Sequence, residues 1–180
     1  MSALFVRVDR AERRICLLAN AACRRRLIRQ TFRVVSRLGD GVFWYALMAS
    51  MPLFVWLDGG SIVDGFRVSL EMACAGTFAL VLYKGLKKKL MRERPFIGLI
   101  GIEAAMPPLD RYSFPSGHTL HAVTLTVIAI SHVPELAVLL VPFALMVAAS
   151  RVVLGLHYPT DVLAGALLGT LIARGSNWFF

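Results

Sequence analysis

The chain has 180 residues, of which 57% are hydrophobic, and its mean hydropathy is +0.66. This composition excludes an ordinary soluble domain and indicates a single integral-membrane domain over residues 1–180. The net charge of +9 could suggest nucleic-acid binding, but basic residues that flank apolar segments are better explained as topology signals and contacts with anionic lipids. We therefore expect no nucleic-acid partner.

Residues 1–37 predict a basic amphipathic segment. Ten arginines alternate with apolar residues there, and no uncharged stretch is long enough to cross a bilayer. We expect a helix lying in the membrane interface, with a solvated basic arm as the alternative. The first residues do not have the pattern of a cleaved signal peptide.

Residues 41–180 predict a transmembrane catalytic core. Five apolar runs are candidates for spans: 41–57, 68–83, 119–133, 136–156 and 162–180. The fold class is therefore all-α, a polytopic bundle of about five transmembrane helices. Gly165 and Gly169 lie four residues apart in the last run, which favours close helix packing.

A tight polar turn, residues 114–119, opens directly into the third apolar run. Its Pro-Ser-Gly sequence ends in His118, and the first N–H groups of the helix that follows would face an anion. Gly117 would let the backbone approach that anion, and His118 has the ordinary pKa of a proton donor near neutral pH. Taken alone, a plain helix N-cap at Ser116 explains the turn equally well.

Two basic segments supply further groups that suit a phosphate. Lys87 and Arg94 are seven residues apart, about two helical turns, so the spacing predicts that both project from one helix face. Further along lie Arg151, His157 and Asp161. Together with the turn, these residues provide what phosphoryl transfer to a histidine nucleophile requires.

The three segments resemble the signature motifs of the type 2 phosphatidic acid phosphatase superfamily, which includes vanadium haloperoxidases and glucose-6-phosphatase. The motifs are K-x-x-x-x-x-x-R-P, P-S-G-H and S-R-x-x-x-x-x-H-x-x-x-D, and this chain matches every fixed position between residues 84 and 165. The resemblance implies that His157 is the nucleophile, that Asp161 orients it and that His118 is the general acid. Substrate-binding residues would be Lys87, Arg94, Ser116, Gly117, Ser150 and Arg151.

The resemblance also implies a phosphorylated lipid as partner, with no metal and no other cofactor. The candidate substrates are undecaprenyl diphosphate, phosphatidylglycerophosphate, phosphatidate and lipid A phosphates. The alternative is a catalytically silent scaffold or transporter of the same fold, although every motif residue is present. The haloperoxidases are soluble, so the apolar runs argue against that activity. No oligomeric state is predicted.

Other polar residues are expected to be structural. We expect His121 to be a packed neighbour of the site, and His132 to lie on the opposite side of the membrane. Glu71 falls inside an apolar run and must face the bundle interior, as a structural hydrogen-bond partner or as a substrate-tuning group. Lys88, Lys89 and Arg92 are expected to contact headgroups, and residues 96–113 to form a lid or a lipid-entry wall. The cysteines have neither disulfide nor metal-site spacing, namely Cys16, Cys23 and Cys74.

The side of the membrane that the site faces is predicted in two ways. Eighteen of the twenty lysines and arginines fall on the site side of a five-span topology, all except Arg67 and Arg174. The positive-inside rule then places the site at the cytoplasmic face of the inner membrane. Bacterial relatives in the family usually carry the site on the outer face, and this alternative stays open.

Overall fold

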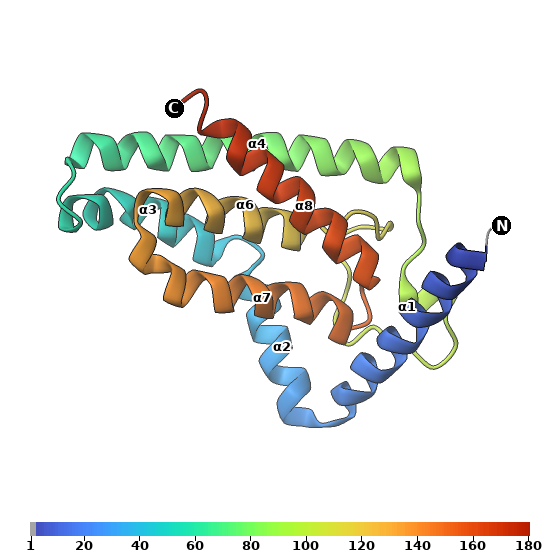
Figure 1. The fold of residues 1–180 in the computed structure, drawn as a ribbon. Helices are drawn as coiled ribbons and strands as arrows, with labels where there is room; N and C mark the ends of the chain where they lie inside the picture. Colours follow the sequence, from blue (N-terminus) through green and yellow to red (C-terminus); the bar gives the residue numbers. More distant parts are fainter. Residues whose placement is uncertain (1–2) are drawn as a thin grey trace.

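The computed structural model describes the backbone of residues 3–180 and the side chains of residues 10–180, and this part of the chain is helical with no β-strand. The helices labelled α3, α4, α6 and α7 run alongside one another, α8 crosses them, and α1 and α2 form a V at one end (Figure 1). This arrangement confirms the expected all-α bundle. The elements are α1 Ala3–Ala21, η1 Ala22–Arg24, α2 Arg26–Leu38, α3 Val42–Leu57, α4 Ile62–Leu90, α5 Pro95–Gly98, α6 Gly117–His132, η2 Pro134–Leu136, α7 Ala137–Val153 and α8 Pro159–Ser176.

Helix α6 is the centre of the bundle and packs against α4, α7 and α8. Its core side chains, such as Leu120 and Ile128, are fully buried. Two glycines of α8, Gly165 and Gly169, let this helix approach α6 closely. A Cβ atom at Gly165 would lie 2.6 Å from the carbonyl oxygen of Ser116, and one at Gly169 would lie 2.6 Å from that of Leu120. The expected small-residue contact is therefore confirmed, and it allows α8 to pack closely against the start of α6.

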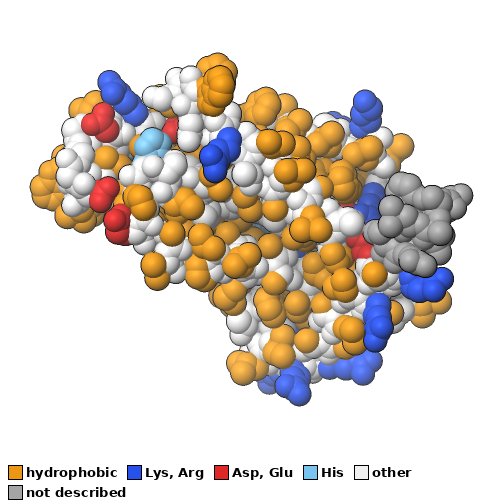
Figure 2. Space-filling view, viewed as in Figure 1, with side chains coloured by type: hydrophobic (Ala, Val, Ile, Leu, Met, Phe, Trp, Pro, Cys, Tyr) orange, Lys and Arg blue, Asp and Glu red, His pale blue; other side chains and the backbone are white. Residues whose placement is uncertain are grey.

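The bundle has the apolar exterior of a membrane protein. Space-filling Figure 2 shows hydrophobic side chains along the length of the bundle, with Lys and Arg concentrated toward the end that carries α1 and α2. In the part of the chain that the structure describes, two segments are long and apolar enough to cross a bilayer, Ile62–Gly98 and Pro134–Val153, and a third qualifies if α2 and α3, bent by 50°, count as one span. Each of the five expected runs contains a helix, but the count of five spans stays a prediction.

The N-terminal segment is helical, and α1 packs on the bundle through polar side chains. The buried face of α1 carries Glu12, Cys16 and Asn20, whereas Ile15 and Leu18 are exposed. Asn20 donates to the carbonyl oxygens of Glu103 and Val153, both at 3.0 Å. Because the apolar side chains point away from the protein, this helix suits an interface with lipid, which stays a prediction. Residues 1–2 and the side chains of residues 3–9 lie outside the described part.

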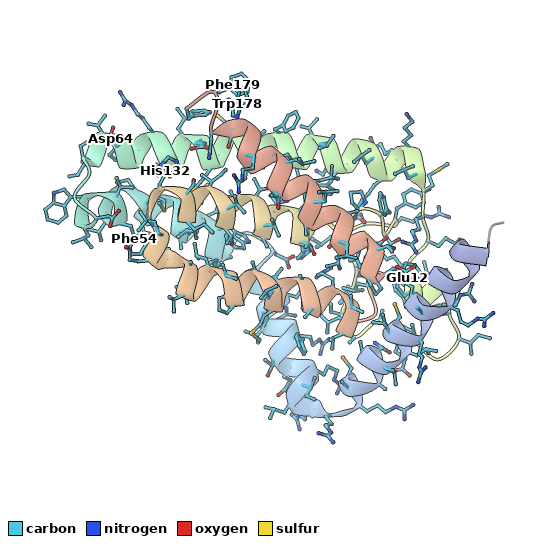
Figure 3. The ribbon with its side chains drawn as sticks, in the orientation of Figure 1. Glu12, Phe54, Asp64, His132, Trp178 and Phe179 are labelled. Atoms are coloured by element: carbon cyan, nitrogen blue, oxygen red, sulfur yellow. The ribbon has the colours of Figure 1, made fainter. Side chains whose placement is uncertain are left out.

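A polar cluster occupies the end of the bundle opposite Glu12 (Figure 3). The side chain of Glu71 is 1% exposed, and its carboxylate lies 3.0 Å from His132 Nε2 and accepts a hydrogen bond from Ser176 Oγ at 2.6 Å. The expectation that Glu71 faces the interior is confirmed. The partners show that its charge is satisfied within the protein, as a carboxylate among apolar helices requires.

Candidate active site

The three motif segments meet at one end of the bundle. A cavity of about 610 Å³ is lined there by charged and imidazole side chains from four segments of the chain: Asp40, Lys87, Arg94, Asp110, His118, Arg151 and His157. His118 comes from the first turn of α6, and His157 from the turn between α7 and α8. The chemical groups that the motifs supply are therefore within reach of one ligand.

The turn before α6 positions His118. Ser116 is the N-cap, and its Oγ accepts the backbone N–H of Thr119 at 3.4 Å and lies 2.9 Å from the Thr119 hydroxyl. Ser116 is fully buried and does not line the cavity, so its side chain serves the helix start. Gly117 does line the cavity, and a Cβ atom there would lie 3.1 Å from the ring of Tyr83. Glycine therefore lets the turn lie directly against α4.

Lys87 and Arg94 come together in a way that their spacing in the sequence does not predict. Lys87 is in the last turn of α4, but the helix ends at Leu90 and Met91 takes a left-handed conformation, with φ 45°. Arg94 then has an extended backbone, as residues before proline favour. The expectation that Lys87 and Arg94 share one helix face is therefore wrong.

A carboxylate brings the two cations together instead. Both Asp110 oxygens accept hydrogen bonds from Lys87 Nζ at 2.8 Å, and Oδ1 also accepts one from Arg94 Nη2 at 2.7 Å. Burial alone would raise the pKa of Asp110, but the hydrogen bond and charge of Lys87, and then those of Arg94, outweigh it and lower the pKa. Asp110 is thus an anion that already lies between the cations of the site.

His157 has the tautomer that a nucleophile needs. Arg94 Nη1 lies 3.2 Å from its Nε2, and because a guanidinium can only donate, the hydrogen-bond network assigns the lone pair to Nε2 and the proton to Nδ1. Nδ1 faces the carboxylate of Asp161 at 3.6 Å, an ion-pair distance that is too long for a hydrogen bond. Burial, followed by the positive charges of Arg151 and Arg94, holds the pKa of His157 well below its usual value, so the ring is neutral.

Asp161 is held by groups at positions that the motifs leave variable. Its carboxylate accepts hydrogen bonds from Arg92 Nη1 at 2.6 Å and from the backbone N–H of Tyr158 at 2.9 Å. Arg92 also donates to Glu12 of α1 at 2.7 Å and lies over the ring of Tyr158. The expectation that Arg92 contacts headgroups is therefore wrong, since it joins α1 to the acid beside His157.

Arg151 and His118 receive partners from the α2–α3 corner. Arg151 is 1% exposed and donates to the hydroxyl of Ser36, while His118 Nε2 contacts the carboxylate of Asp40. Among the described residues, Arg151 Nε is a buried side-chain nitrogen without a hydrogen-bond partner. It is a donor available to an anion in the cavity.

Two other predicted neighbours lie as follows. Ser150 is fully buried, donates to the carbonyl oxygen of Val147 at 2.6 Å and does not line the cavity, so nothing here supports its expected contact with substrate. His121 packs one turn beyond His118, with its ring nitrogens 3.0 Å from Gly117 O and 3.1 Å from Gly76 O. Within residues 10–180, no group of three or more His, Cys, Asp or Glu side chains is arranged to hold a metal ion.

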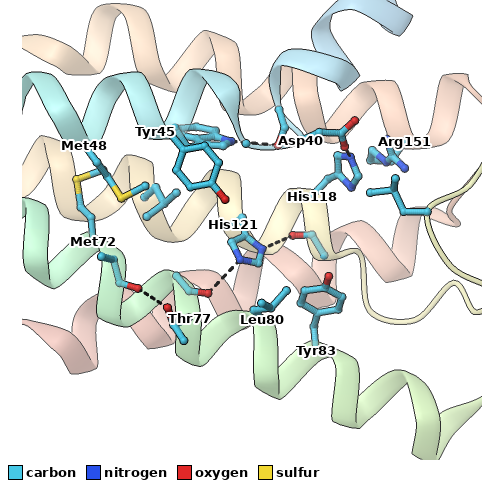
Figure 4. Close-up of a pocket in the computed structure, with 18 of the residues that line it drawn as sticks. Asp40, Tyr45, Met48, Met72, Thr77, Leu80, Tyr83, His118, His121 and Arg151 are labelled. Atoms are coloured by element: carbon cyan, nitrogen blue, oxygen red, sulfur yellow. Dashed lines mark hydrogen bonds and ion pairs between the residues drawn. The ribbon is translucent and has the colours of Figure 1, made fainter.

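The cavity continues away from the charged groups into an apolar groove between α3, α4 and α6. Met48, Met72 and Leu80 line this part, with Tyr45 and Tyr83 nearer the polar end (Figure 4). The ligand that fits the whole cavity therefore has an anionic group at one end and an apolar chain at the other.

Sequence reasoning missed three carboxylates of the site: Glu12, Asp40 and Asp110. Each is distant in sequence from the residue that it contacts, so no local spacing reveals it. The signal for Asp110 was an acid in the loop between two motifs, eight residues before His118. The signal for Asp40 was an acid between two glycines, just before the first apolar run.

The site's sequence and fold both have known counterparts. The model of the PAP2 superfamily matches residues 68–180. An undecaprenyl-diphosphatase from Sulfolobus acidocaldarius is 30% identical over 125 residues, which are 67% of this chain and 61% of that protein. A decaprenylphosphoryl-5-phosphoribose phosphatase from Mycolicibacterium smegmatis is 38% identical over 137 residues, which are 74% of this chain and 68% of that protein. This chain therefore spans less than two thirds of the length of the first of these relatives.

A solved structure is similar over almost the whole chain. The crystal structure of a transmembrane PAP2-type phosphatidylglycerolphosphate phosphatase from Bacillus subtilis superposes with a TM-score of 0.73 at 26% sequence identity. The match covers 96% of this chain and 85% of that one, so it includes the N-terminal helices that precede the motifs.

Proposed function

Because the chain belongs to the PAP2 superfamily, we propose that it is a membrane phosphatase that removes a phosphoryl group from a phosphorylated lipid through a phosphohistidine at His157. The observation that carries this proposal is the shape of the cavity. One end of the cavity is lined by Lys87, Arg94 and Arg151, and the other end is an apolar groove between membrane helices. A soluble phosphate ester would use the first part alone, whereas a lipid phosphate uses both.

In the first step, Nε2 of His157 attacks phosphorus, forming the N–P bond as the bond from phosphorus to the lipid oxygen breaks. The ring is already neutral, and Asp161 is placed to stabilise the positive charge that develops on it. His118 gives its proton to the leaving oxygen. Lys87, Arg94 and Arg151 stabilise the charge on the three oxygens of the transferring group.

In the second step, water attacks the phosphohistidine and His118 takes the proton of that water. The N–P bond breaks, Nε2 recovers its lone pair, and inorganic phosphate leaves. We expect the phosphate to displace Asp110 from Lys87 and Arg94, because the carboxylate occupies hydrogen-bond donors of both cations. Binding therefore exchanges one anion for another between the same two cations.

The substrate class follows from the groove and the site. The relatives named above act on undecaprenyl diphosphate, decaprenylphosphoryl-5-phosphoribose and phosphatidylglycerolphosphate, according to their names. For this chain we propose a mono- or diphosphate ester of a long-chain lipid in the inner membrane. The charge distribution supports a site at the cytoplasmic face, which favours phosphatidylglycerophosphate or phosphatidate.

The test is phosphate release by purified protein in mixed micelles. The panel contains phosphatidylglycerophosphate, phosphatidate, undecaprenyl diphosphate and a lipid A phosphate, and glycerol 3-phosphate is the matched ester without a chain. We expect at least one lipid to be hydrolysed far faster than glycerol 3-phosphate, and His157→Ala to release none. Equal rates with and without the lipid chain would contradict the proposed substrate class, and full activity in His157→Ala would contradict the mechanism.

A further inference from the structure

The turn between α2 and α3, Gly39-Asp40-Gly41, is built to hold one acid in a fixed place. The N–H of Gly39 donates to Val35 O at 2.9 Å, and its carbonyl oxygen accepts the indole N–H of Trp44 at 3.2 Å. A Cβ atom at Gly39 would lie 3.0 Å from Val147 of α7, so glycine allows the turn to lie against that helix. Gly41 has φ +147°, a conformation that favours glycine. The acid between them therefore has little freedom to move.

The fixed acid faces the imidazole that the motifs identify as the proton donor. The carboxylate of Asp40 contacts His118 Nε2, and both residues line the cavity beside Arg151 (Figure 4). The His118 side chain is 10% exposed and that of Asp40 is 28% exposed, so solvent screens this contact only in part. The contact joins residues 78 positions apart, and the three motifs do not include Asp40.

A carboxylate at this place meets an electrostatic need of the reaction. A general acid must carry a proton before the first step, but burial, followed by the charge of Arg151, lowers the pKa of His118 to about 4, and the hydrogen bond and charge of Asp40 oppose this shift only in part. Asp40 is the acid in contact with this ring, and it stabilises the protonated form. By accepting a hydrogen bond from Nε2, it also leaves Nδ1 as the nitrogen that can exchange a proton with substrate and water.

We propose that Asp40 is a positioning residue for His118, which holds the ring by Nε2 and favours its protonated form, so that Nδ1 delivers the proton to the leaving lipid oxygen. This inference rests on the proposed function. In the first step the Nδ1 proton moves to the lipid oxygen as its bond to phosphorus breaks. In the second step Nδ1 takes a proton from the attacking water, which restores the starting state.

The test is Asp40→Asn, which keeps the shape of the side chain and removes its charge. Two substrates are compared, a lipid phosphate with an alkoxide leaving group and 4-nitrophenyl phosphate, whose leaving group departs without a proton. We expect kcat for the lipid to fall about 10- to 100-fold, within the usual range of general acid catalysis, with little change in KM. The release of 4-nitrophenolate in the first turnover, which reports the first step alone, should change by less than about threefold, because this leaving group needs no proton. Asp58→Asn, at an exposed position at the end of α3, is the matched control.

Two further variants separate positioning from a general structural role. Asp40→Glu keeps the charge and should recover part of the lipid rate. Because Asp40 acts through His118, the double variant Asp40→Asn/His118→Ala should be no slower on the lipid than His118→Ala alone. The ratio of lipid to 4-nitrophenyl rates, measured on one sample, does not depend on the folded fraction, so poor folding of a variant does not mask the result.

The proposal is overturned if Asp40→Asn slows the reactions of both substrates equally or if it changes KM alone. It is also overturned if the fall in lipid rate caused by Asp40→Asn multiplies in full with the fall caused by His118→Ala in the double variant. Failure of the proposed function gives a different result. In that case the wild-type protein releases no phosphate from the lipid, or His157→Ala is as active as wild type. The two ideas can therefore fail independently.

Discussion

Asp110→Asn should make the protein less stable and its phosphate site stronger at the same time. In the absence of substrate, the Asp110 carboxylate accepts hydrogen bonds from Lys87 and Arg94, whose residues are only 6% and 1% exposed. The amide of asparagine keeps the size of the side chain but removes its negative charge. Two buried cations then lack their shared counterion, and an incoming phosphate no longer has a competitor.

The size of each effect follows from the contacts. Hydrogen bonds between charged groups contribute about 1.5–3 kcal/mol each. The Asp110 side chain is 38% exposed, so solvent screening reduces the loss for the pair of contacts to about 2 kcal/mol. For a chain of this size, we expect Tm to fall by about 6 °C. Because phosphate no longer displaces a carboxylate, its Kd should fall by up to about tenfold, which corresponds to 1.4 kcal/mol.

The assay is thermal unfolding of detergent-solubilised protein over a series of inorganic phosphate concentrations. Without phosphate, the variant should have a lower Tm than wild type, and each increment of phosphate should raise its Tm by more than that of wild type. Because the pKa of Asp110 is lowered, the wild-type carboxylate stays ionised and the difference should persist from neutral pH to mildly acidic pH. Asp58→Asn controls for the loss of one negative charge. Weaker phosphate binding in Asp110→Asn would refute the reasoning, since it would mean that Asp110 helps to build the phosphate site.

Three further predictions concern the nucleophile, its pH dependence and the topology. Arg92→Ala removes the partner of Asp161 at 2.6 Å, so kcat should fall about tenfold or more with KM nearly unchanged. Steady-state kinetics check this, and an unchanged kcat would exclude a role of Arg92 in holding Asp161. The pKa of His157 is lowered from 6.5, so it binds a proton more readily when unfolded. The contribution of His157 to stability is therefore complete above pH 6.5 and is lost as the pH falls, so Tm should decline below that pH. In the folded protein His157 stays neutral, so the acid limb of the kcat/KM profile that His157 sets should lie below pH 6.5, and a limb at 6.5 that His157 sets would contradict this. In a cysteine-free background, Lys88→Cys should resist an impermeant thiol reagent in intact cells, and its labelling would place the site outside.

The residues that the sequence could identify are those whose chemistry depends on short spacing. Ser116, Gly117 and His118 form one helix start, and His157 and Asp161 flank one helix N-terminus, so each set is ordered by local backbone geometry. The helices also follow from the sequence, because each apolar run is long enough to bury its own backbone groups in a helix.

Other features depended on contacts between distant segments. Lys87 and Arg94 are near neighbours in sequence, but the left-handed conformation at Met91 sends the chain out of α4, and only the loop that carries Asp110 reunites them. Glu12 looks like one more charge in a basic arm until α1 packs against α8, where it accepts hydrogen bonds from Arg92 and from the N–H of Thr160. The pairing of a buried carboxylate with its cation depends on how distant segments pack, and the spacing of residues along the sequence does not contain that information.

The central claim is that His157 carries the phosphoryl group during turnover, and acid-quench trapping tests it most directly. Wild-type protein is mixed with a lipid substrate labelled with ³²P at the phosphate that leaves, quenched within milliseconds and digested for mass spectrometry under alkaline conditions, where phosphohistidine survives. The account predicts a label on the peptide that contains His157, bound by an acid-labile bond, and no label on that peptide in His157→Ala. Turnover at the wild-type rate with no label on that peptide, or a label on another residue, would contradict the account.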